Sequence, residues 1–213
     1  MLIEVKVTVL SPIHLSSGQA DVNVDSDVVH DKYGLPYFPA KRLKGLLYES
    51  AVEVREMAEA AGMKFINQEV IDELFQHGTT ADVQLIAEDL RLAGYEEIKT
   101  DLEYLEKQYP EFIRKEDVLQ EFTSIRFQTA IDKETGTAQK SSLRNIRVVD
   151  AGVEFVGNWE LKNEEEKYLQ VLALAMQNLS SAGGKRNRGF GEIRCTMTDQ
   201  EKLVEQAIRK DAV

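Results

Sequence analysis

The spacing of apolar residues changes several times along this chain, and each change limits which element can form. Residues 2–10 alternate between apolar and polar side chains, the pattern of a strand with one buried face. From Ala40 to Ala60 the apolar residues recur at helical spacing. Further elements follow as strands at 123–131, 153–161 and 191–197, and as helices at 164–181 and 198–210. The chain is therefore expected to combine helices and strands in one α+β fold.

A middle segment, 67–121, shows helical spacing throughout. We expect it to belong to an acidic, all-helical insertion over 53–121, while 1–52 and 122–213 together form the core domain. With the insertion set aside, the order of elements matches a ferredoxin-like βαββαβ domain, in which helices cover one face of a sheet. Two stretches show little periodicity: 19–32, read as a loop, and 140–147, which is basic.

The charge of the chain is unevenly distributed. Its net charge is −11, and residues 53–121 hold 18 acidic and 7 basic side chains. The remaining residues hold 19 of each sign, with cations gathered near 41–44, 126, 140–147 and 185–188. Salt screens exposed charges beyond about 8–10 Å, so the local potential decides which partner approaches. The acidic total therefore does not exclude RNA as a partner.

Membrane and disulfide-rich classes are excluded by simple counts. The first six residues already carry charges, and no stretch reaches the roughly 20 apolar residues that a membrane span needs. Cys195 is the single cysteine, which rules out an intramolecular disulfide and a multi-cysteine zinc site. We expect a cytoplasmic protein with no membrane partner.

Two segments suit phosphate binding better than core packing. Segment 25–46, DSDVVHDKYGLPYFPAKRLKGL, joins an acidic stretch to a turn and a basic helix start. Segment 183–191, GGKRNRGFG, holds four glycines and three cations in nine residues. Backbone N–H groups beside glycine bind phosphate together with Lys and Arg, although a mobile loop is the alternative for 183–191. It is not a nucleotide P-loop, because the Gly-Lys-Ser/Thr end is missing.

Four patches, in order and over most of the chain, resemble the RAMP superfamily, the repeat-associated RNA-binding proteins of CRISPR systems. They are 11–18; 25–31 followed by 34–39 and 43–45; Arg126 with 130–138; and 183–191. The similarity is greatest to the small backbone subunit that is repeated along type III effector complexes.

This resemblance implies a ferredoxin-like, RRM-like core that holds guide RNA, with copies stacked into a filament beside other effector subunits. It also implies a protruding hairpin that displaces a target base at regular intervals. In many type III systems this subunit cuts the target RNA in antiviral defence, using one Asp ahead of the Gly-x-Pro-Tyr block. Asp25 takes that place here, and Asp27 or Asp31 would fit if the loop register differs.

Asp25 is thus the expected catalytic and metal-binding residue. A single carboxylate suits Mg²⁺ or another divalent cation, since Mg²⁺ keeps most of its waters and takes few protein ligands. Direct general-base catalysis is the weaker role, because an unperturbed aspartate with a pKa of about 3.9 is a poor base at neutral pH. The alternative is a solvated turn residue.

Further RNA contacts are expected from cations near these patches. Lys44 would share a phosphate with the N-terminal amides of its helix, or else be an ordinary surface lysine. His14 would either bond RNA or have a structural role. The predicted RNA-binding residues are His14, Lys41, Arg42, Lys44, Arg126, Arg144, Gly183, Gly184, Lys185, Arg186, Arg188 and Gly189.

The chain departs from the superfamily pattern in three places. It has Ala40-Lys41-Arg42 where relatives often have Gly-Ser-Ser, which adds charge beside the expected RNA backbone. Arg147 stands where many relatives have an acidic residue, so the central basic stretch is expected to contact RNA differently. The zinc site that some relatives carry in the insertion cannot be built from these residues.

Three other functions remain open on the sequence alone. The first alternative is an RNA-binding scaffold of the same superfamily without activity. The second is a relative that processes guide RNA with a His-based site and no metal. The third alternative is a protein-interaction module whose acidic insertion docks a basic partner. That module predicts no RNA affinity even at low salt, where phosphate contacts are strongest.

Overall fold

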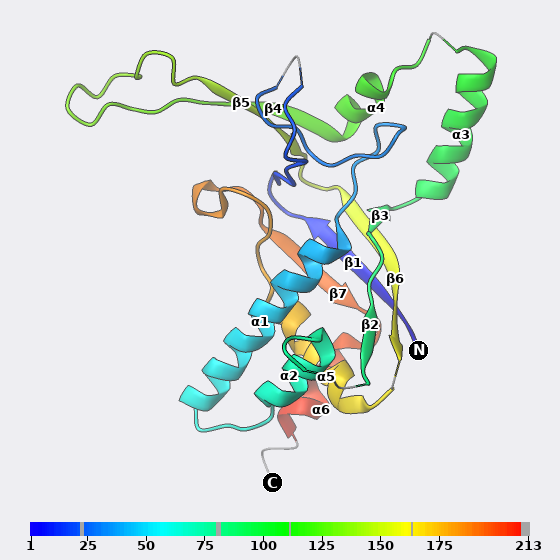
Figure 1. Cartoon of the computed structure of the whole chain (residues 1–213), viewed down its shortest axis with the longest axis vertical. Coiled ribbons are helices and arrows are strands. Elements are labelled where there is room, and N and C mark those ends of the chain that lie inside the picture. The colour runs from blue at the N-terminus through cyan, green and yellow to red at the C-terminus, as the bar shows by residue number, and fades with distance from the viewer. Residues whose placement is uncertain (22–23, 80–81, 111, 163, 210–213) are drawn as a thin grey trace.

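An antiparallel sheet lies at the centre of the protein in the computed structural model, which describes residues 1–21, 24–79, 82–110, 112–162 and 164–209. Its strands follow the order β2-β6-β1-β7, and β3 also pairs with β6 (Figure 1). They are β1 (Leu2–Val9), β2 (Gln84–Ile86), β3 (Arg91–Leu92), β6 (Glu154–Lys162) and β7 (Ile193–Met197). Ile3, Val5, Val7 and Val9 are all buried, which confirms the strand predicted at 2–10.

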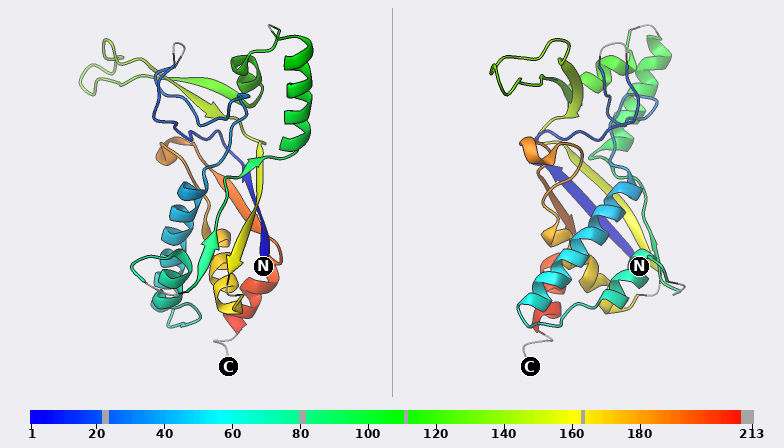
Figure 2. Two further views of the ribbon diagram at one scale, coloured as in Figure 1. Left: turned by 45° about the vertical axis from the view of Figure 1, so that its right-hand side comes forward. Right: turned by 60° about the vertical axis from the view of Figure 1, so that its left-hand side comes forward.

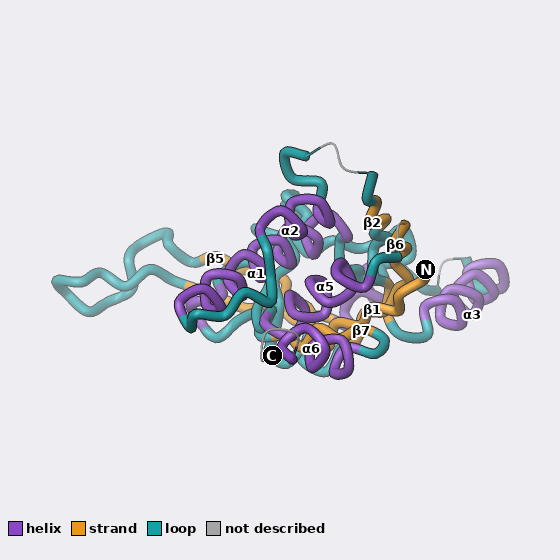
Figure 3. The backbone as a smooth tube through the Cα atoms, turned by 90° about the horizontal axis from the view of Figure 1, so that it is seen from below, coloured by secondary structure: helices purple, strands orange, loops and turns teal. Residues whose placement is uncertain are grey.

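Four helices pack on this sheet: α1 (Ala40–Ala60), α2 (Gln68–Phe75), α5 (Glu166–Asn178) and α6 (Gln200–Arg209). α5 contacts β7 as well as α1, α2 and α6, so the four helices share one apolar core with the sheet (Figure 3). α1 begins and ends where the apolar spacing predicted. Lys210, the predicted end of the last helix, lies outside the described residues, as do 22–23 in the loop predicted at 19–32.

The segment 67–121 is not helical throughout, so that prediction was wrong for its middle part. Leu85 of β2 pairs with Leu161, and Leu92 of β3 pairs with Phe155, so both strands extend the main sheet. Strands of three and two residues are too short to show an alternating pattern. The helical prediction holds for α2, α3 (Tyr95–Gln108) and α4 (Lys115–Phe122).

A second two-stranded sheet stands at one end of the main sheet. β4 (Thr123–Gln128) and β5 (Arg144–Val149) form an antiparallel hairpin whose loop reaches far beyond the body (Figures 1 and 2). β5 was not predicted, because Ile146, Arg147, Val148 and Val149 are buried in succession and leave no alternation. We call this end the head; it comprises 11–39, 93–152 and 181–191.

Close contacts hold segments together within both the head and the body. Gly34 has φ +86°, and a Cβ there would lie 2.1 Å from the carbonyl oxygen of Lys115, so only glycine lets the loop pass α4. Trp159 is fully buried in β6 and donates its Nε1–H to the Glu88 carbonyl over 3.0 Å, which identifies it as a core residue. Across the described parts of the chain, no helix is long and apolar enough to cross a membrane.

Candidate RNA-binding interface

The loop that carries Asp25 is tied to the hairpin strand β5. The Asp25 N–H donates to Asn145 Oδ1 over 2.8 Å, and the Asn145 N–H donates to Asp25 Oδ2 over 2.8 Å. Asp25 is nevertheless exposed to solvent. Its carboxylate is therefore oriented by the protein and still open to a ligand from outside.

Asp27 is committed to the interior. Its Oδ1 accepts from Arg147 Nε over 2.9 Å, and the two side chains are 10% and 3% exposed. The same oxygen also accepts from the Val28 N–H. An ion pair buried in this way is costly to break from one side, because the remaining charge has no partner. Arg147 was expected to alter the RNA contacts of the basic stretch, but it points inward to Asp27. Because Asp27 is buried in this pair, it suits catalysis less well than Asp25.

Asp31 also has structural partners. Its Oδ1 accepts from the N–H groups of Tyr33 and Leu35, and its Oδ2 accepts from the Tyr95 hydroxyl over 2.7 Å. Burial, together with this bond to the Asp31 carboxylate, raises the pKa of Tyr95 to about 12. Among the three aspartates considered, Asp25 is the one with an exposed carboxylate.

His14 connects three distant segments of the head. Burial lowers the pKa of His14, so its ring is neutral at pH 7. Nδ1–H then donates to the Arg147 carbonyl over 2.7 Å, and Nε2 accepts from the Ser26 hydroxyl over 3.1 Å. The backbone N–H of Gly184 donates to the His14 carbonyl over 3.0 Å. Of the two roles considered for His14, these bonds favour the structural one.

The glycine-rich loop folds against this connection. Gly183 has φ +79°, and a Cβ there would lie 2.8 Å from the His14 carbonyl oxygen. The loop then forms a single 3₁₀ turn, Arg186–Arg188. Lys185, Arg186 and Arg188 border an open hollow of about 570 Å³ beside Gly183. Exposed cations around such a hollow can neutralise phosphate groups.

The basic start of α1 has protein partners of its own. Arg42 Nη2 donates to the Ser16 carbonyl over 2.6 Å, and Lys44 Nζ donates to the Leu85 carbonyl over 3.2 Å. Burial lowers the pKa of Lys44. The first helical amide, at Ala40, donates to the Asp89 carboxylate over 2.8 Å. Lys41 and Arg42 stay exposed, whereas Lys44 stabilises the contact of α1 with β2.

The hairpin supplies two further predicted contacts. Arg126 and Arg144 are exposed on β4 and β5, where Arg144 pairs with Gln128. Gln128 Oε1 accepts from Lys185 Nζ, so the base of the hairpin touches the glycine-rich loop. The structure thus brings together 183–188, the hairpin base and the Asp25 loop, and Arg42 is tied to the same region through the Ser16 carbonyl.

Comparisons with known proteins identify the family of this chain. A sequence model of the RAMP superfamily matches residues 6–194. The chain belongs to the RAMP superfamily. A comparison with curated proteins finds no match for this RAMP protein.

Solved structures share the fold of this RAMP protein. One chain, from the cryo-EM structure of the type III-B Cmr-beta bound to cognate target RNA, has a TM-score of 0.66 and 12% identity, covering 96% of this chain and 99% of that chain. Another, from the cryo-EM structure of the type III-B Cmr-beta in the apo state, has a TM-score of 0.64 and 11% identity with the same coverage. At such low identity the likeness shows the fold, a mixed helix-and-sheet arrangement with antiparallel sheets.

Sequence reasoning missed three residues of the RAMP interface: Asn145, Ser26 and Gln128. Each acts through its bond to Asp25, His14 or Lys185. Asn145 and Gln128 lie on the hairpin strands, whereas their partners Asp25 and Lys185 lie on loops far away in the sequence. No pattern in a single sequence reveals these contacts.

A divalent cation in this RAMP protein would depend on few protein ligands. Within the described ranges, no group of three or more His, Cys, Asp or Glu side chains could hold a metal ion. The exposed Asp25 carboxylate fits a cation that is shared with RNA phosphate, because Mg²⁺ is often bound by one or two carboxylates plus substrate oxygens.

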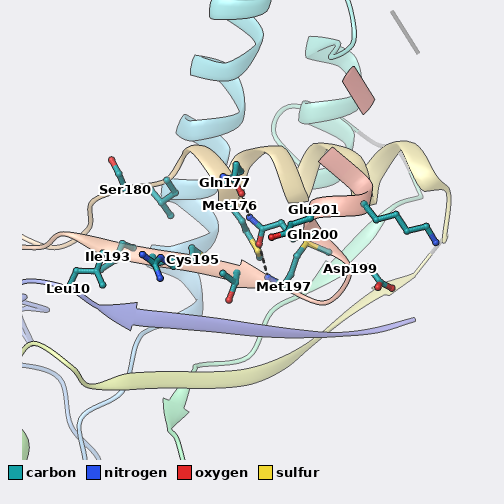
Figure 4. Close-up of a pocket in the computed structure, with 14 residues that line it drawn as sticks. Leu10, Met176, Gln177, Ser180, Ile193, Cys195, Met197, Asp199, Gln200 and Glu201 are labelled. Carbon is teal, nitrogen blue, oxygen red and sulfur yellow. Dashed lines mark hydrogen bonds between the residues drawn. The ribbon is translucent and has the colours of Figure 1, made fainter. Parts of the chain in front are cut away.

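A hollow of about 820 Å³ lies elsewhere in the RAMP protein, between α5, β7 and α6 (Figure 4). Its lining includes Gln177, Cys195 and Gln200 and none of the predicted RNA-binding residues. Burial raises the pKa of Cys195 to about 12, so the thiol is not a reactive nucleophile at neutral pH. This hollow is therefore separate from the candidate RNA-binding interface in the head.

Proposed function

We propose that this RAMP protein is the guide-RNA-binding backbone subunit of a type III CRISPR effector complex and that it cuts the paired target RNA. One observation carries the proposal: the exposed Asp25 lies beside a cationic surface made from segments that are far apart in sequence. His14 joins these segments through Ser26, Arg147 and Gly184. The partners would be guide RNA, target RNA, copies of this chain and other effector subunits in antiviral defence.

The topology supports a ferredoxin-like core for this subunit. The elements β1, α1, β2, β6, α5 and β7 follow the order βαββαβ, and β1 lies between β6 and β7 in the sheet. In this assignment β2 is the second strand of the core, so the insertion begins after β2 instead of at residue 53.

The guide backbone would lie along the cations of the glycine-rich loop and of the start of α1. Lys41, Arg42, Lys185, Arg186 and Arg188 are exposed, and Gly183 lets the loop pass close to the His14 carbonyl because it has no Cβ. Contacts of this kind read the RNA backbone rather than its sequence, which suits a subunit that must accept any guide. The exposed hairpin, with Arg126, would reach the target strand.

Cleavage of the target would follow the intrinsic reactivity of RNA. The 2′-oxygen attacks the adjacent phosphorus, the bond to the 5′-oxygen breaks, the 2′-OH proton leaves to solvent and the 5′-oxygen gains a proton. A divalent cation, when bound, supplies charge stabilisation at the phosphate. The bond from Asn145 orients the Asp25 carboxylate, which would hold the cation. Asp25 would therefore be both the metal ligand and the catalytic residue.

Two alternatives are weaker on the same geometry. A metal-independent processing enzyme that uses His14 would need an accessible imidazole, but both ring nitrogens of this residue are bonded within the protein. A scaffold without activity is favoured by one observation, the bond of the Asp25 carboxylate to Asn145, which is also typical of a structural turn. Cleavage by the wild type and its loss in Asp25→Asn separate the scaffold from the nuclease.

The first test is to purify the protein with the products of its neighbouring genes and to measure the 260/280 nm absorbance ratio and the extracted RNA. We expect bound RNA of uniform length with a repeat-derived end. RNA-free protein that also ignores added RNA at low salt would contradict the proposal, since phosphate contacts are strongest there.

A further inference from the structure

The segment that carries Asp25 pairs with the hairpin as a third strand. Ser26 forms a parallel bridge with Ile146 of β5. The Ser26 carbonyl accepts from the Arg147 N–H over 3.0 Å, and the Asp25 N–H donates to the Asn145 carbonyl, also over 3.0 Å. β5 therefore lies between β4 on one side and the Asp25 segment on the other.

β5 divides its backbone groups between these two neighbours. The N–H groups of Asn145 and Arg147 bond the Asp25 segment. Alternate residues of a strand direct their backbone groups to opposite sides, so those of Arg144 and Ile146 face β4. A displacement of β5 along its own axis would consequently move the hairpin and the Asp25 segment together.

The Asp25 carboxylate depends on this strand through one oxygen. The Asn145 N–H donates to Asp25 Oδ2 over 2.8 Å, and among the described residues no group donates to Oδ1. Because the donor belongs to the backbone, the path of β5 decides where the carboxylate lies, whereas rotation of the Asn145 side chain does not. Oδ1 is left for a ligand from outside, such as the divalent cation of the proposed function.

The hairpin ends in a long arm, residues 129–143, that projects beyond the rest of the molecule (Figures 1 and 2). The opposite end of β5 is held in the head, because Arg147 pairs with Asp27 over 2.9 Å and its carbonyl accepts from His14 over 2.7 Å. β5 is thus anchored at Arg147, while Asn145 lies on the side of the arm. Movement of the arm would therefore reach Asn145 before it is stopped at the anchor.

We propose that β5 couples the arm to Asp25, so that contact of the arm with target RNA holds the carboxylate in its cutting position. The inference rests on the proposed function and adds a regulator of the same site. Asn145 is a positioning residue in this scheme, and its backbone N–H is the group that acts. The arm would thereby act on the protein side of the reaction, in addition to any effect on the path of the RNA.

Amide hydrogen exchange of the complex loaded with guide RNA tests this coupling without metal or cleavage. Exchange over residues 24–28 is compared with and without a complementary target that carries 2′-deoxy nucleotides and so lacks the attacking oxygen. In the wild type, the target should slow exchange over 24–28 and over β4 by about tenfold or more, because a steadied hairpin sheet opens less often.

Two variants separate the coupling from direct contact of the target with the same segment. In the shortened-arm variant, Asn-Gly replaces residues 131–138; the hairpin can close there, since the Gln139 N–H donates to the Ala130 carbonyl over 2.9 Å. Asn145→Pro removes the N–H that holds Oδ2 and breaks no bond to β4, and Asn145→Ala is its matched variant, which keeps this N–H. The target should slow exchange over 24–28 in Asn145→Ala but in neither of the other two.

The response of β4 shows whether the proline variant is intact, because β4 should still be protected by the target in Asn145→Pro. The shortened arm decides the question by itself should the proline variant fail to fold. Slowing over 24–28 that equals the wild type in either the shortened arm or a folded Asn145→Pro would overturn the proposal. A wild type in which the target has no effect on 24–28 would overturn it too.

The Mg²⁺ concentration for half-maximal cleavage gives a second readout. It should rise by about tenfold in the shortened arm and in Asn145→Pro, because each leaves the carboxylate less well held. A variant with both changes should need no more Mg²⁺ than the more affected single one, since both interrupt the same connection. Effects that multiply would contradict the coupling. A wild type that does not cut the target would defeat the proposed function and leave the exchange result standing.

Discussion

β1 and β4 have the same alternating pattern in the sequence but different surroundings. In β1, Val5 and Val7 are fully buried between the sheet and its helices. In β4, Ile125 and Phe127 occupy alternate positions too, yet Phe127 is 68% exposed. Only the body has a layer of helices to cover its strand. The body thus uses its apolar residues for its own core, whereas the head leaves some of them exposed to solvent.

The largest expected difference comes from making one substitution in both regions. Phe155→Ala removes a fully buried ring in β6 and should lower the free energy of unfolding by about 3–5 kcal/mol. Phe127→Ala removes an exposed ring and should change it by no more than about 0.5 kcal/mol. Urea denaturation followed by circular dichroism measures both values. Equal losses would refute the contrast between body and head.

Breaking the buried ion pair of the head should lower the free energy of unfolding, as a core substitution in the body does. Arg147→Met leaves the Asp27 carboxylate buried without its cation and should cost about 3 kcal/mol. A double variant, Asp27→Leu with Arg147→Met, should regain part of this loss, because no unpaired charge remains. The same denaturation experiment reads both variants. A double variant as unstable as the sum of the single ones would show that the pair itself contributes little.

RNA binding should depend on the cations of the glycine-rich loop and not on those of α6. Replacing Lys185, Arg186 and Arg188 by Ala should weaken RNA binding and lower the slope of log affinity against log salt by about 2, since each lost phosphate contact on single-stranded RNA removes about 0.7. Lys202→Ala with Arg209→Ala, on α6, is the control and should leave both unchanged. Fluorescence anisotropy at several salt concentrations gives the slopes. An equal loss in the control would remove the basis for placing RNA on the head.

The smallest expected effect concerns His14. Burial lowers its pKa in the folded state, so the unfolded chain binds more protons as the pH falls. Its contribution to stability is complete above the ordinary histidine pKa of about 6.5 and declines below it, by at most about 1.4 kcal/mol per pH unit. The free energy of unfolding is measured for the wild type and for His14→Gln between pH 8 and pH 5. It should change less with pH in the variant. Parallel profiles would mean that His14 is not the group that titrates.

The sequence predicted those parts of the fold whose pattern reflects burial on one side only. α1 and β1 follow that rule, and both were located. β5 was missed because its residues are buried in succession, and β2 and β3 were missed because they are too short to show a period. Their pairing with β4 and β6 depends on tertiary contacts, which local patterns do not encode.

The candidate site was predicted unevenly for a related reason. The motifs identified the Asp25 loop and the glycine-rich loop, which the structure brings together through His14. They could not show that Lys44 bonds the Leu85 carbonyl or that Arg147 pairs with Asp27, because each partner lies far away in the sequence. The exposure of a charged side chain is a property of the folded chain rather than of its residue type.

Target cleavage by the complex loaded with guide RNA tests the central claim most directly. Asp25→Asn keeps an oxygen for the Asn145 N–H and removes the negative charge, and Asp132→Asn, a partly exposed carboxylate in the hairpin loop, is the matched control. With Mg²⁺ and a complementary target, Asp25→Asn should lower the cleavage rate by about 100-fold or more while target binding is unchanged. The control should cut like the wild type. Cleavage at the wild-type rate by Asp25→Asn would contradict the account.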